Sequence, residues 1–296
     1  MLNYHPATVL VLGASGMLGN AVLQVFARSP GYSVVGTVRS TAAQRLLPAF
    51  LREKVIPGVD VENFDCLARV LGQVRPQVVI NCIGLVKQLA EADDPLTALP
   101  INSLLPHRLA GLCELVRARL VHMSTDCVFS GAKGAYTEDA PSDASDLYGR
   151  SKFLGEVDRP HAVTLRTSII GHELQSTHGL INWFLAQRGR VMGYRRAVFS
   201  GLPTVVLAVA IRDYVLPHPE LHGVHHVSAA PINKFELLSL VAKVYGSETE
   251  VIPDDEVCID RSLDSTRFRD RTGFVADEWP ELIRRMHAFQ RDAAQT

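Results

Sequence analysis

The stretch TVLVLGASGMLG, residues 8–19, joins an apolar run to a glycine-rich turn and decides the fold. Residues 8–13 have the composition of a buried strand, and the following ASGMLGNAVLQVFARS has the pattern of a helix. Gly13, Gly16 and Gly19 therefore lie between a strand and a helix. Glycines in this place permit a tight turn and a close approach of the backbone to a pyrophosphate, which meets the helix N-terminus. The alternative is a turn whose glycines serve packing alone.

The strand–helix alternation continues through the first half of the chain. Further strands are predicted at residues 32–39, 76–84, 119–125 and 162–170, with helical segments between them. This order predicts an α/β fold, a doubly wound parallel Rossmann sheet with helices on both faces. We expect a dinucleotide-binding domain over residues 1–170 and a smaller C-terminal substrate-binding domain over 171–296. Residues from about 204 to 228, with a strand at GVHHVSA, are expected to return to the sheet.

Composition restricts the class of partner. The 296 residues are 47% hydrophobic and 21% charged, and the net charge is −1, so nothing favours bulk binding to nucleic acid or to an anionic membrane. No apolar run approaches the roughly 18 residues of a membrane span, and the first residues lack the pattern of a signal peptide. The five cysteines are scattered and form no CxxC pair. A cytoplasmic protein with reduced thiols and small-molecule partners is expected.

The residue after the second strand bears on cofactor choice. An acidic residue there binds the adenosine ribose 2′-hydroxyl, whereas a basic residue accommodates a 2′-phosphate. This chain has Arg39, followed by Ser40 and Thr41. The sequence therefore favours NADPH, with NADH as the alternative, and Asp60 is a candidate adenine contact.

The segment YGRSK places Tyr148 and Lys152 four residues apart, on one face of a predicted helix. Ser124 and Thr125 stand at the carboxyl end of a predicted strand, where open α/β folds bind their ligands. Tyrosine, lysine and hydroxyl side chains brought together suit proton donation to a carbonyl oxygen. An ordinary amphipathic helix with a packed tyrosine and a solvated lysine is the alternative for YxxxK alone.

A series of motifs in order along nearly the whole chain resembles the extended short-chain dehydrogenase/reductase family. They are GASGMLG, VVINCIG, the pair Ile101–Asn102, STDCVFSG, YGRSK, LRTS, GLPT and GVHHVSA. Within that family the likeness is to the dTDP-4-dehydrorhamnose reductases and their nucleotide-sugar relatives. The resemblance implies NAD(P)H-dependent reduction of the C4 ketone of a nucleotide-linked 4-keto-6-deoxyhexose, in the synthesis of deoxysugar precursors.

The resemblance also implies roles for matching residues. Thr125 would hydrogen-bond the substrate carbonyl, Tyr148 would be the general acid, and Lys152 would hold the nicotinamide ribose and lower the pKa of the tyrosine. Asn102 would organise the lysine and a proton-relay water. The expected cofactor-binding residues are Gly13, Ser15, Gly16, Met17, Leu18, Gly19, Arg39, Asp60, Cys82, Ile83, Gly84, Asn102, Tyr148 and Lys152. The expected substrate-binding residues are Lys87, Thr125, Asp126, Cys127, Asn182, Trp183 and Arg261.

Two departures from the family pattern concern the sugar pocket. Cys127 stands where these reductases usually have a tyrosine, and the stretch after LRTS reads IIGHELQSTHG in place of an aromatic followed by YG. The identity of the deoxysugar and of the nucleotide, dTDP or UDP, therefore stays open.

Charged residues outside these motifs give weaker signals. The arginines of the C-terminal half could supply a phosphate clamp: Arg190, Arg195, Arg196, Arg261 and Arg267. His222, His225 and His226 have the alternation of a half-buried strand, so no metal site is expected. The acidic pair at 93–94 and the three acidic residues at 254–256 have the character of solvated turns.

Two other functions remain open at this point. The regulatory β-subunit of methionine adenosyltransferase is similar in fold and resembles this chain at the tyrosine and lysine, so the chain could bind NADP and a protein partner without turnover. An epimerase of the same family, which keeps a bound NAD through its cycle, is the other. A homodimer is compatible with each of them.

Overall fold

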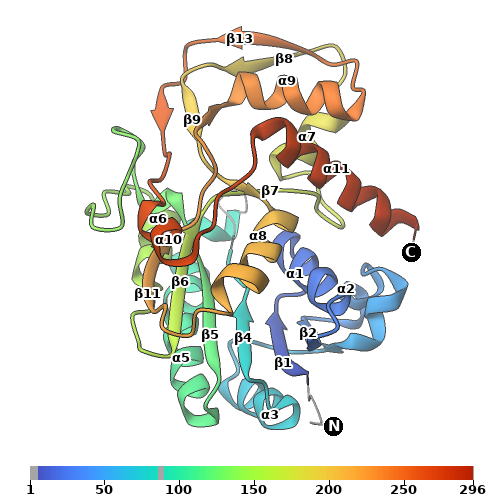
Figure 1. The fold of residues 1–296 in the computed structure, drawn as a ribbon, viewed down its shortest axis with the longest axis vertical. Helices are drawn as coiled ribbons and strands as arrows, with labels where there is room; N and C mark the ends of the chain where they lie inside the picture. Colours follow the sequence, from blue (N-terminus) through green and yellow to red (C-terminus); the bar gives the residue numbers. More distant parts are fainter. Residues whose placement is uncertain (1–5, 86–89, 296) are drawn as a thin grey trace.

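The computed structural model describes residues 6–85 and 90–295, and its largest element is a parallel sheet (Figure 1). Within those residues the sheet has seven strands in the order β11-β6-β5-β4-β1-β2-β3. The strands are β1 (Ala7–Leu12), β2 (Tyr32–Val38), β3 (Val55–Pro57), β4 (Val78–Asn81), β5 (Arg119–Thr125), β6 (Ala162–Thr167) and β11 (Gly223–His226). The strand order reverses between β1 and β4, and ligands of open α/β sheets bind beyond the carboxyl ends of the strands at such a point. The predicted doubly wound Rossmann fold is confirmed.

Helices cover both faces of the sheet because successive residues of each buried strand point to opposite sides. On β1, Val9 and Val11 belong to one apolar core, whereas Leu10 and Leu12 belong to the other. The first core includes α1 (Met17–Ala27) and α8 (Thr204–Ala210), and the second includes α3 (Phe64–Val74) and α5 (Leu105–Val116). A sheet buried on both faces explains the nearly continuous apolar runs of its strands.

The C-terminal part lies above the carboxyl ends of the sheet strands in Figure 1. It contains a parallel pair, β8 (Arg190–Tyr194) with β13 (Glu250–Asp254), and a small sheet of β12 (Ile232–Asn233), β9 (Ala197–Phe199) and β14 (Ile259–Asp260). Its helices are α7 (Leu180–Ala186), α9 (Lys234–Tyr245), α10 (Thr266–Thr272) and α11 (Trp279–Gln295). Leu237 of α9 and Leu282 of α11 share the first core with β1 and α1, so this core runs without a break from the sheet into the C-terminal part.

The strands predicted from the sequence are confirmed to within a few residues, with two differences. The short edge strand β3 was not predicted, because three residues carry too little periodicity to be seen. The strand expected at 162–170 breaks at Ser168 into β6 and β7 (Ile169–Ile170), and β7 pairs with β10 (Leu202–Pro203) outside the main sheet.

The helical segment predicted between the strands at 76–84 and 119–125 also differs from the expectation. It begins earlier, as α4 (Pro95–Ala98) and a π-helical turn over Leu99–Leu104, before it continues as α5. A second π-helical turn, Ile211–Val215, follows α8. The remaining short helices are α2 (Thr41–Arg45), α6 (Leu147–Leu154) and single 3₁₀ turns at Ala49–Lys54, Ala90–Asp93 and Asp126–Val128.

Candidate active site

The glycine turn between β1 and α1 has the geometry of an anion-binding loop. Gly13 has a φ of 78°, which favours glycine, and a Cβ on Gly19 would lie 2.1 Å from the Gly13 carbonyl oxygen. The turn can therefore close only with glycine at both places. Ser15, Gly16 and Met17 stay partly or fully exposed at the N-terminus of α1, whose free N–H groups favour a phosphate. The turn fits a dinucleotide pyrophosphate.

The next two strands end in side chains suited to the other end of such a cofactor. Arg39 is exposed directly after β2, and Ser40 caps α2 by accepting a hydrogen bond from the Ala43 N–H at 3.2 Å. Asp60 is exposed after β3, and its Oδ1 accepts from the Glu62 N–H at 3.0 Å. Both residues lie on the same side of the glycine turn, since β3, β2 and β1 are neighbours.

The segment after β4 lies across the strand-order reversal from the glycine turn. The Cys82 N–H donates to the Leu12 carbonyl at 3.1 Å, and the Ile83 N–H donates to Asn81 Oδ1 at 3.1 Å. Burial raises the pKa of the Cys82 thiol to about 12, so it stays protonated and is no nucleophile. A Cβ on Gly84 would lie 3.5 Å from Asn102 Oδ1 and 3.6 Å from Lys152 Nζ. Gly84 thus faces both polar groups.

Thr125 is the last residue of β5 and is buried. Its Oγ1 accepts from the Cys127 N–H and donates to Asp126 Oδ1, each at 3.1 Å, and its side chain also hydrogen-bonds the phenol of Tyr148. These bonds fix the hydroxyl at the carboxyl end of the sheet, as the sequence predicted.

Helix α6 brings Tyr148 and Lys152 against this strand end. Asp146 caps the helix by accepting from the Gly149 N–H at 2.7 Å. A Cβ on Gly149 would lie 2.2 Å from the Cys127 carbonyl oxygen, so the absence of a side chain lets the helix pack directly on the loop after β5. The i and i+4 side chains of Tyr148 and Lys152 consequently reach the same strand end.

Lys152 is buried, and its ammonium donates to the Met123 carbonyl of β5 at 2.7 Å. Burial lowers its pKa to about 8, while the charge of Glu156 opposes that change. The Nζ atom lies between β5 and the Gly84 backbone.

Burial raises the pKa of Tyr148 well above its usual value, and the neighbouring Cys127 and Asp126 add to this, whereas the bond with Thr125 lowers it. The net direction is opposite to the lowering that we expected from Lys152. Removal of the phenol from water is the largest cause of this direction, and Lys152 is not among the charges that act on the phenol. Tyr148 is a protonated donor at neutral pH.

Asn102 and Ser151 tie α6 to the π-helical turn. Asn102 Oδ1 accepts from the Leu85 N–H at 2.9 Å, its Nδ2 donates to Ser151 Oγ at 3.1 Å, and Ser151 Oγ donates to the Tyr148 carbonyl at 2.9 Å. A Cβ on Gly155 would lie 1.9 Å from the Asn102 carbonyl oxygen. π-helical turns are frequent at functional sites. The serine between the tyrosine and the lysine therefore has a structural role that its place in the sequence did not reveal.

The predicted substrate residues fall into two groups. Asp126 and Cys127 follow Thr125 directly, and Arg261 lies beside them with its Nε donating to the Phe129 carbonyl at 2.9 Å. Asn182 and Trp183 lie on α7. The Asn182 amide donates to the carbonyls of Glu173 and Ser176, and Trp183 is 38% exposed. Lys87 lies outside the described residues.

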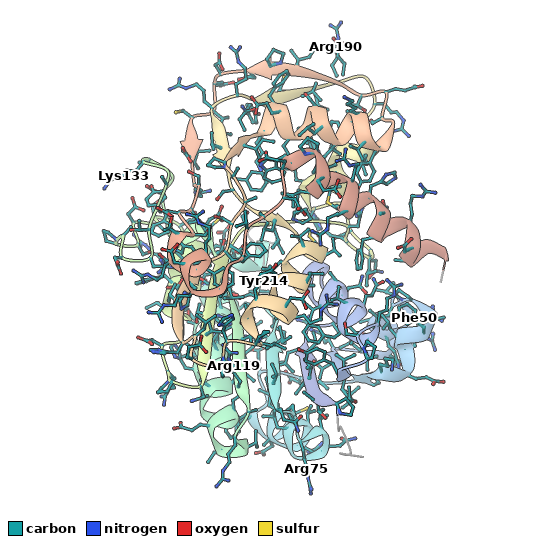
Figure 2. The ribbon with its side chains drawn as sticks, in the orientation of Figure 1. Phe50, Arg75, Arg119, Lys133, Arg190 and Tyr214 are labelled. Atoms are coloured by element: carbon teal, nitrogen blue, oxygen red, sulfur yellow. The ribbon has the colours of Figure 1, made fainter. Side chains whose placement is uncertain are left out.

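Most of the predicted arginine cluster is engaged with carboxylates at the surface. Arg190 pairs with Glu250 at 2.8 Å and points outward from β8 (Figure 2), Arg195 pairs with Asp255, and Arg267 pairs with Asp139 at 2.5 Å. Arg261 is the member of the set that reaches the loop after β5.

The sequence did not predict two features of the site. Lys234, the first residue of α9, holds its ammonium 3.8 Å from the centroid of the Phe199 ring and interacts electrostatically with Asp126 and Cys127. A buried pair of Arg166 and Glu156 lies behind Ser124, whose Oγ donates to Glu156 Oε1 at 2.7 Å. Residue type alone gave no signal for either, because each depends on contacts between distant segments.

The histidines near residue 225 are part of the buried structure. His226 Nδ1 lies 3.0 Å from the Tyr136 carbonyl oxygen and its Nε2 lies 3.3 Å from Arg166 Nη1. Burial lowers the pKa of His226 to about 3, so it is neutral. In the part of the chain that the structure describes, no group of three or more histidine, cysteine or acidic side chains could hold a metal ion. The helices of that same part include none long and apolar enough to cross a membrane.

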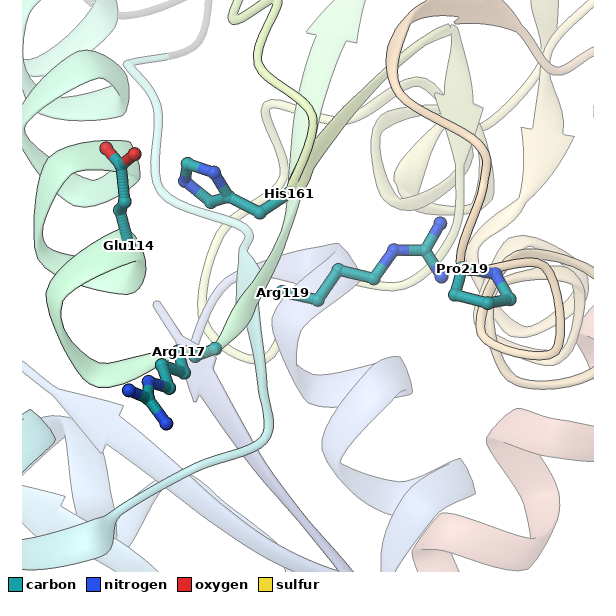
Figure 3. A pocket seen from close by; sticks show the side chains of 6 residues that line it. Glu114, Arg117, Arg119, His161 and Pro219 are labelled. Atoms are coloured by element: carbon teal, nitrogen blue, oxygen red, sulfur yellow. The ribbon is translucent and has the colours of Figure 1, made fainter.

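A hollow of about 380 Å³ lies at the amino ends of the sheet strands, between Glu114, Arg119 and His161 (Figure 3). Arg119 crosses it and donates to the carbonyls of Val215, His218 and Leu221 at 2.7, 2.8 and 3.1 Å. The hollow lies where β5 and β6 begin, whereas Thr125 lies where β5 ends, so the hollow and the candidate site are separate.

The fold and the site define an α/β protein of the extended short-chain dehydrogenase/reductase type, with its threonine, tyrosine and lysine at the carboxyl edge of a Rossmann sheet. The chain belongs to the family described as "RmlD substrate binding domain", whose model matches residues 7–287. The resemblance inferred from the motifs is thereby confirmed.

Individual curated proteins are also similar to this chain. A probable dTDP-4,6-dihydroxy-2-methyloxan-3-one 4-ketoreductase from Streptomyces antibioticus is 30% identical over 240 residues, covering 75% of this chain and 71% of the relative. Methionine adenosyltransferase 2 subunit beta from Xenopus tropicalis is 24% identical over 272 residues, covering 84% and 76%. For three other curated relatives, the matched segment spans only between 43% and 57% of the relative's length.

Among solved structures, dTDP-4-dehydrorhamnose reductase from Bacillus anthracis in complex with NADP superposes with a TM-score of 0.78. The two are 22% identical, and the match covers 96% of this chain and 100% of the other. At this identity the likeness establishes the fold.

Proposed function

We propose that the protein is an NADPH-dependent oxidoreductase that reduces the C4 ketone of a nucleotide-linked 4-keto-6-deoxyhexose. The observation that carries the proposal is the convergence of Thr125, Tyr148 and Lys152 at the carboxyl end of β5, opposite the glycine turn. Bound NADPH supplies hydride to a ketone carbon in this class of reaction. The sheet edge, the glycine turn and the family membership support the proposal.

Each side chain has a role that follows from its protonation and contacts. Tyr148, protonated at neutral pH, donates its phenolic proton to the alkoxide that forms at C4. Thr125 orients the tyrosine hydroxyl and hydrogen-bonds the carbonyl oxygen. Lys152 holds the ribose hydroxyls, and its positive charge, one helical turn from Tyr148, favours the phenolate that forms when the proton leaves.

The other predicted positions complete the cofactor site. Arg39 beyond β2 supports NADPH over NADH, because a guanidinium pairs with a 2′-phosphate. Asn102 fixes the backbone at Leu85 and, through Ser151, the start of α6, so it positions the tyrosine and lysine. We also propose the division into residues 1–170 and 171–296, a cytoplasmic location and a homodimer as the working assembly.

The direct test is consumption of NADPH with dTDP-4-keto-rhamnose and then with UDP-linked N-acetylated 4-keto sugars. Tyr148→Phe is expected to lower kcat by about 10²-fold or more, because general-acid catalysis contributes about 10²–10⁴-fold. Tyr214→Phe is a matched control, since this tyrosine lies in the π-helical turn after α8 and packs edge-on against Phe274 at 5.3 Å. Full turnover by a folded Tyr148→Phe protein would refute the assignment.

The same assay separates the other candidates. Tight NADPH binding without turnover on any keto-sugar, together with a stoichiometric protein partner, would favour a regulatory subunit like the β-subunit relative. Purification with a retained NAD that does not exchange would favour an epimerase, because a reductase must exchange its cofactor in each cycle.

A further inference from the structure

Two cations of the C-terminal part directly follow the two strands that flank β9 in one small sheet. In that sheet β9 lies between β12 and β14, and Val198 of β9 pairs with Asn233 on one side and with Asp260 on the other. Lys234 and Arg261 are the next residues after those two partners. Strand pairing therefore places the two cations on either side of β9. Each lies one residue beyond the level of Val198, in opposite directions, because β12 runs antiparallel and β14 parallel to β9.

Both cations face the loop that follows Thr125. Arg261 Nε donates to the Phe129 carbonyl at 2.9 Å, and a Cβ on Gly131 would lie 3.0 Å from the Arg261 Cγ. The Lys234 ammonium lies over the Phe199 ring, and its charged neighbours are Asp126 and Cys127. Both side chains thus lie against the loop that follows the proposed catalytic residue Thr125.

The positive charges at the loop after Thr125 outnumber the negative ones. Asp126 is the buried carboxylate that interacts with both Arg261 and Lys234, and it also accepts the Thr125 hydroxyl at 3.1 Å. Two cations therefore face one carboxylate, whereas Arg190, Arg195 and Arg267 each have a carboxylate of their own at the surface. A cation partly withdrawn from water and incompletely paired favours a bound anion.

We propose that Lys234, assisted by Arg261, binds the diphosphate of the nucleotide-linked substrate and is a specificity-determining residue for it. This inference rests on the proposed function for the position of the sugar. With the C4 carbonyl at Thr125 and Tyr148, the diphosphate on C1 lies across the width of one sugar ring. The proposal places the diphosphate against the two cations that face the loop after Thr125.

The two side chains suit the two parts of a diphosphate. The guanidinium of Arg261 presents a planar fork to phosphate oxygens, and the Lys234 ammonium is a point charge on a flexible stem. The aromatic ring of Phe199 holds that ammonium in place through a cation–π contact without neutralising it. Asp126 keeps the two cations near each other against their mutual repulsion.

The test compares Lys234→Met with Lys243→Met. Methionine keeps an unbranched apolar side chain without the charge, and Lys243 is an exposed lysine in the last turn of the same helix. Binding of dTDP and UDP, and of thymidine and uridine, is measured by calorimetry, with KM and kcat for a 4-keto sugar nucleotide that the wild-type protein reduces. NADPH affinity and the thermal midpoint report whether each variant is folded.

The expected result for Lys234→Met is a loss of at least about tenfold in affinity for both diphosphates. Nucleoside and NADPH affinities are unchanged, KM rises by a similar factor with kcat nearly constant, and Lys234→Arg restores most of the loss. Unchanged diphosphate affinity in a folded Lys234→Met protein would overturn the proposal, as would a fall in kcat alone. Absent turnover in the wild-type protein, with Lys234-dependent diphosphate binding, would refute the proposed function but not this inference.

Discussion

At the residue scale, the two ionisable groups of α6 differ in their response to burial. Removal from water favours the neutral form of each, so it raises the pKa of Tyr148 and lowers the pKa of Lys152 to about 8. The phenol remains a proton donor over the whole neutral range. The lysine is the member of the pair whose charge changes at an accessible pH.

The proposed reaction is therefore expected to lose rate on the alkaline side. Because the folded-state pKa of Lys152 is about 8 against an ordinary value of 10.5, the ammonium loses its proton as pH rises through about 8. A plot of kcat/KM against pH should fall above that value with the slope of one proton.

Lys234 also has a pKa lowered by burial to about 8, so the profile must be repeated with Lys234→Met. A descending limb that persists in this variant assigns it to Lys152. A profile flat to pH 10 in the wild-type protein would contradict the role given to Lys152.

The sequence predicted one part of this site and not the other, for a physical reason. The i, i+4 spacing of Tyr148 and Lys152 is local, and so is the hydroxyl at the end of β5. Lys234 reaches Asp126 because β12 pairs with β9, a contact between segments far apart in the chain. No local pattern encodes that pairing.

At the element scale, the position of α6 depends on glycines that allow close backbone contact. Gly149 faces the Cys127 carbonyl and Gly155 faces the Asn102 carbonyl, so the helix is held between the loop after β5 and the π-helical turn. The sequence YGRSKFLGE showed the helix but not its close neighbours.

Gly149→Ala is expected to destabilise the protein and to displace Tyr148. Its Cβ would lie 2.2 Å from the Cys127 carbonyl oxygen, and overpacking of this kind costs about 1–3 kcal/mol or more. Gly111→Ala is the control, because Gly111 lies in α5 with nothing within 4 Å of a Cβ, and it is expected to gain about 0.5–1 kcal/mol. Urea denaturation gives both values, and equal stability of the two variants would show that α6 can move without cost.

At the scale of the whole molecule, a buried ion pair connects segments on both sides of the site. Arg166 of β6 contacts Glu156 through two nitrogens, each at 2.6 Å, and reaches His226 of β11 at 3.3 Å. The His226 ring nitrogen Nδ1 lies 3.0 Å from the Tyr136 carbonyl oxygen, and the His226 backbone N–H donates to Glu138 Oε1 at 2.9 Å. The sheet, the loop before α6 and the C-terminal part are joined through this group of side chains.

Removal of one partner is expected to be severe because the other charge stays buried. Arg166→Met should lower the free energy of unfolding by about 3–5 kcal/mol, since both side chains of the pair are less than 10% exposed. Arg190→Met, which breaks an exposed pair with Glu250, is expected to cost about 0–1 kcal/mol. Chemical denaturation of both variants measures the difference, and a loss below about 1 kcal/mol in Arg166→Met would contradict the buried-pair interpretation.

The fold class was predictable at this scale because long apolar runs alternate with helical periods, and each run is buried on both faces of a parallel sheet. The C-terminal part was less predictable. Its strands β9, β12 and β14 have two or three residues each, too few for a period of two to show.

The position of β11 has a consequence for biosynthesis. This strand pairs with β6 and occupies an edge of the sheet, yet some fifty residues separate the two strands in the chain. At roughly 5–20 residues per second, the ribosome needs about 3–11 s to add the residues between them. During that interval the backbone of β6 presents an unpaired edge, open to association with other nascent chains. A chaperone that binds extended polypeptide would have its best opportunity here.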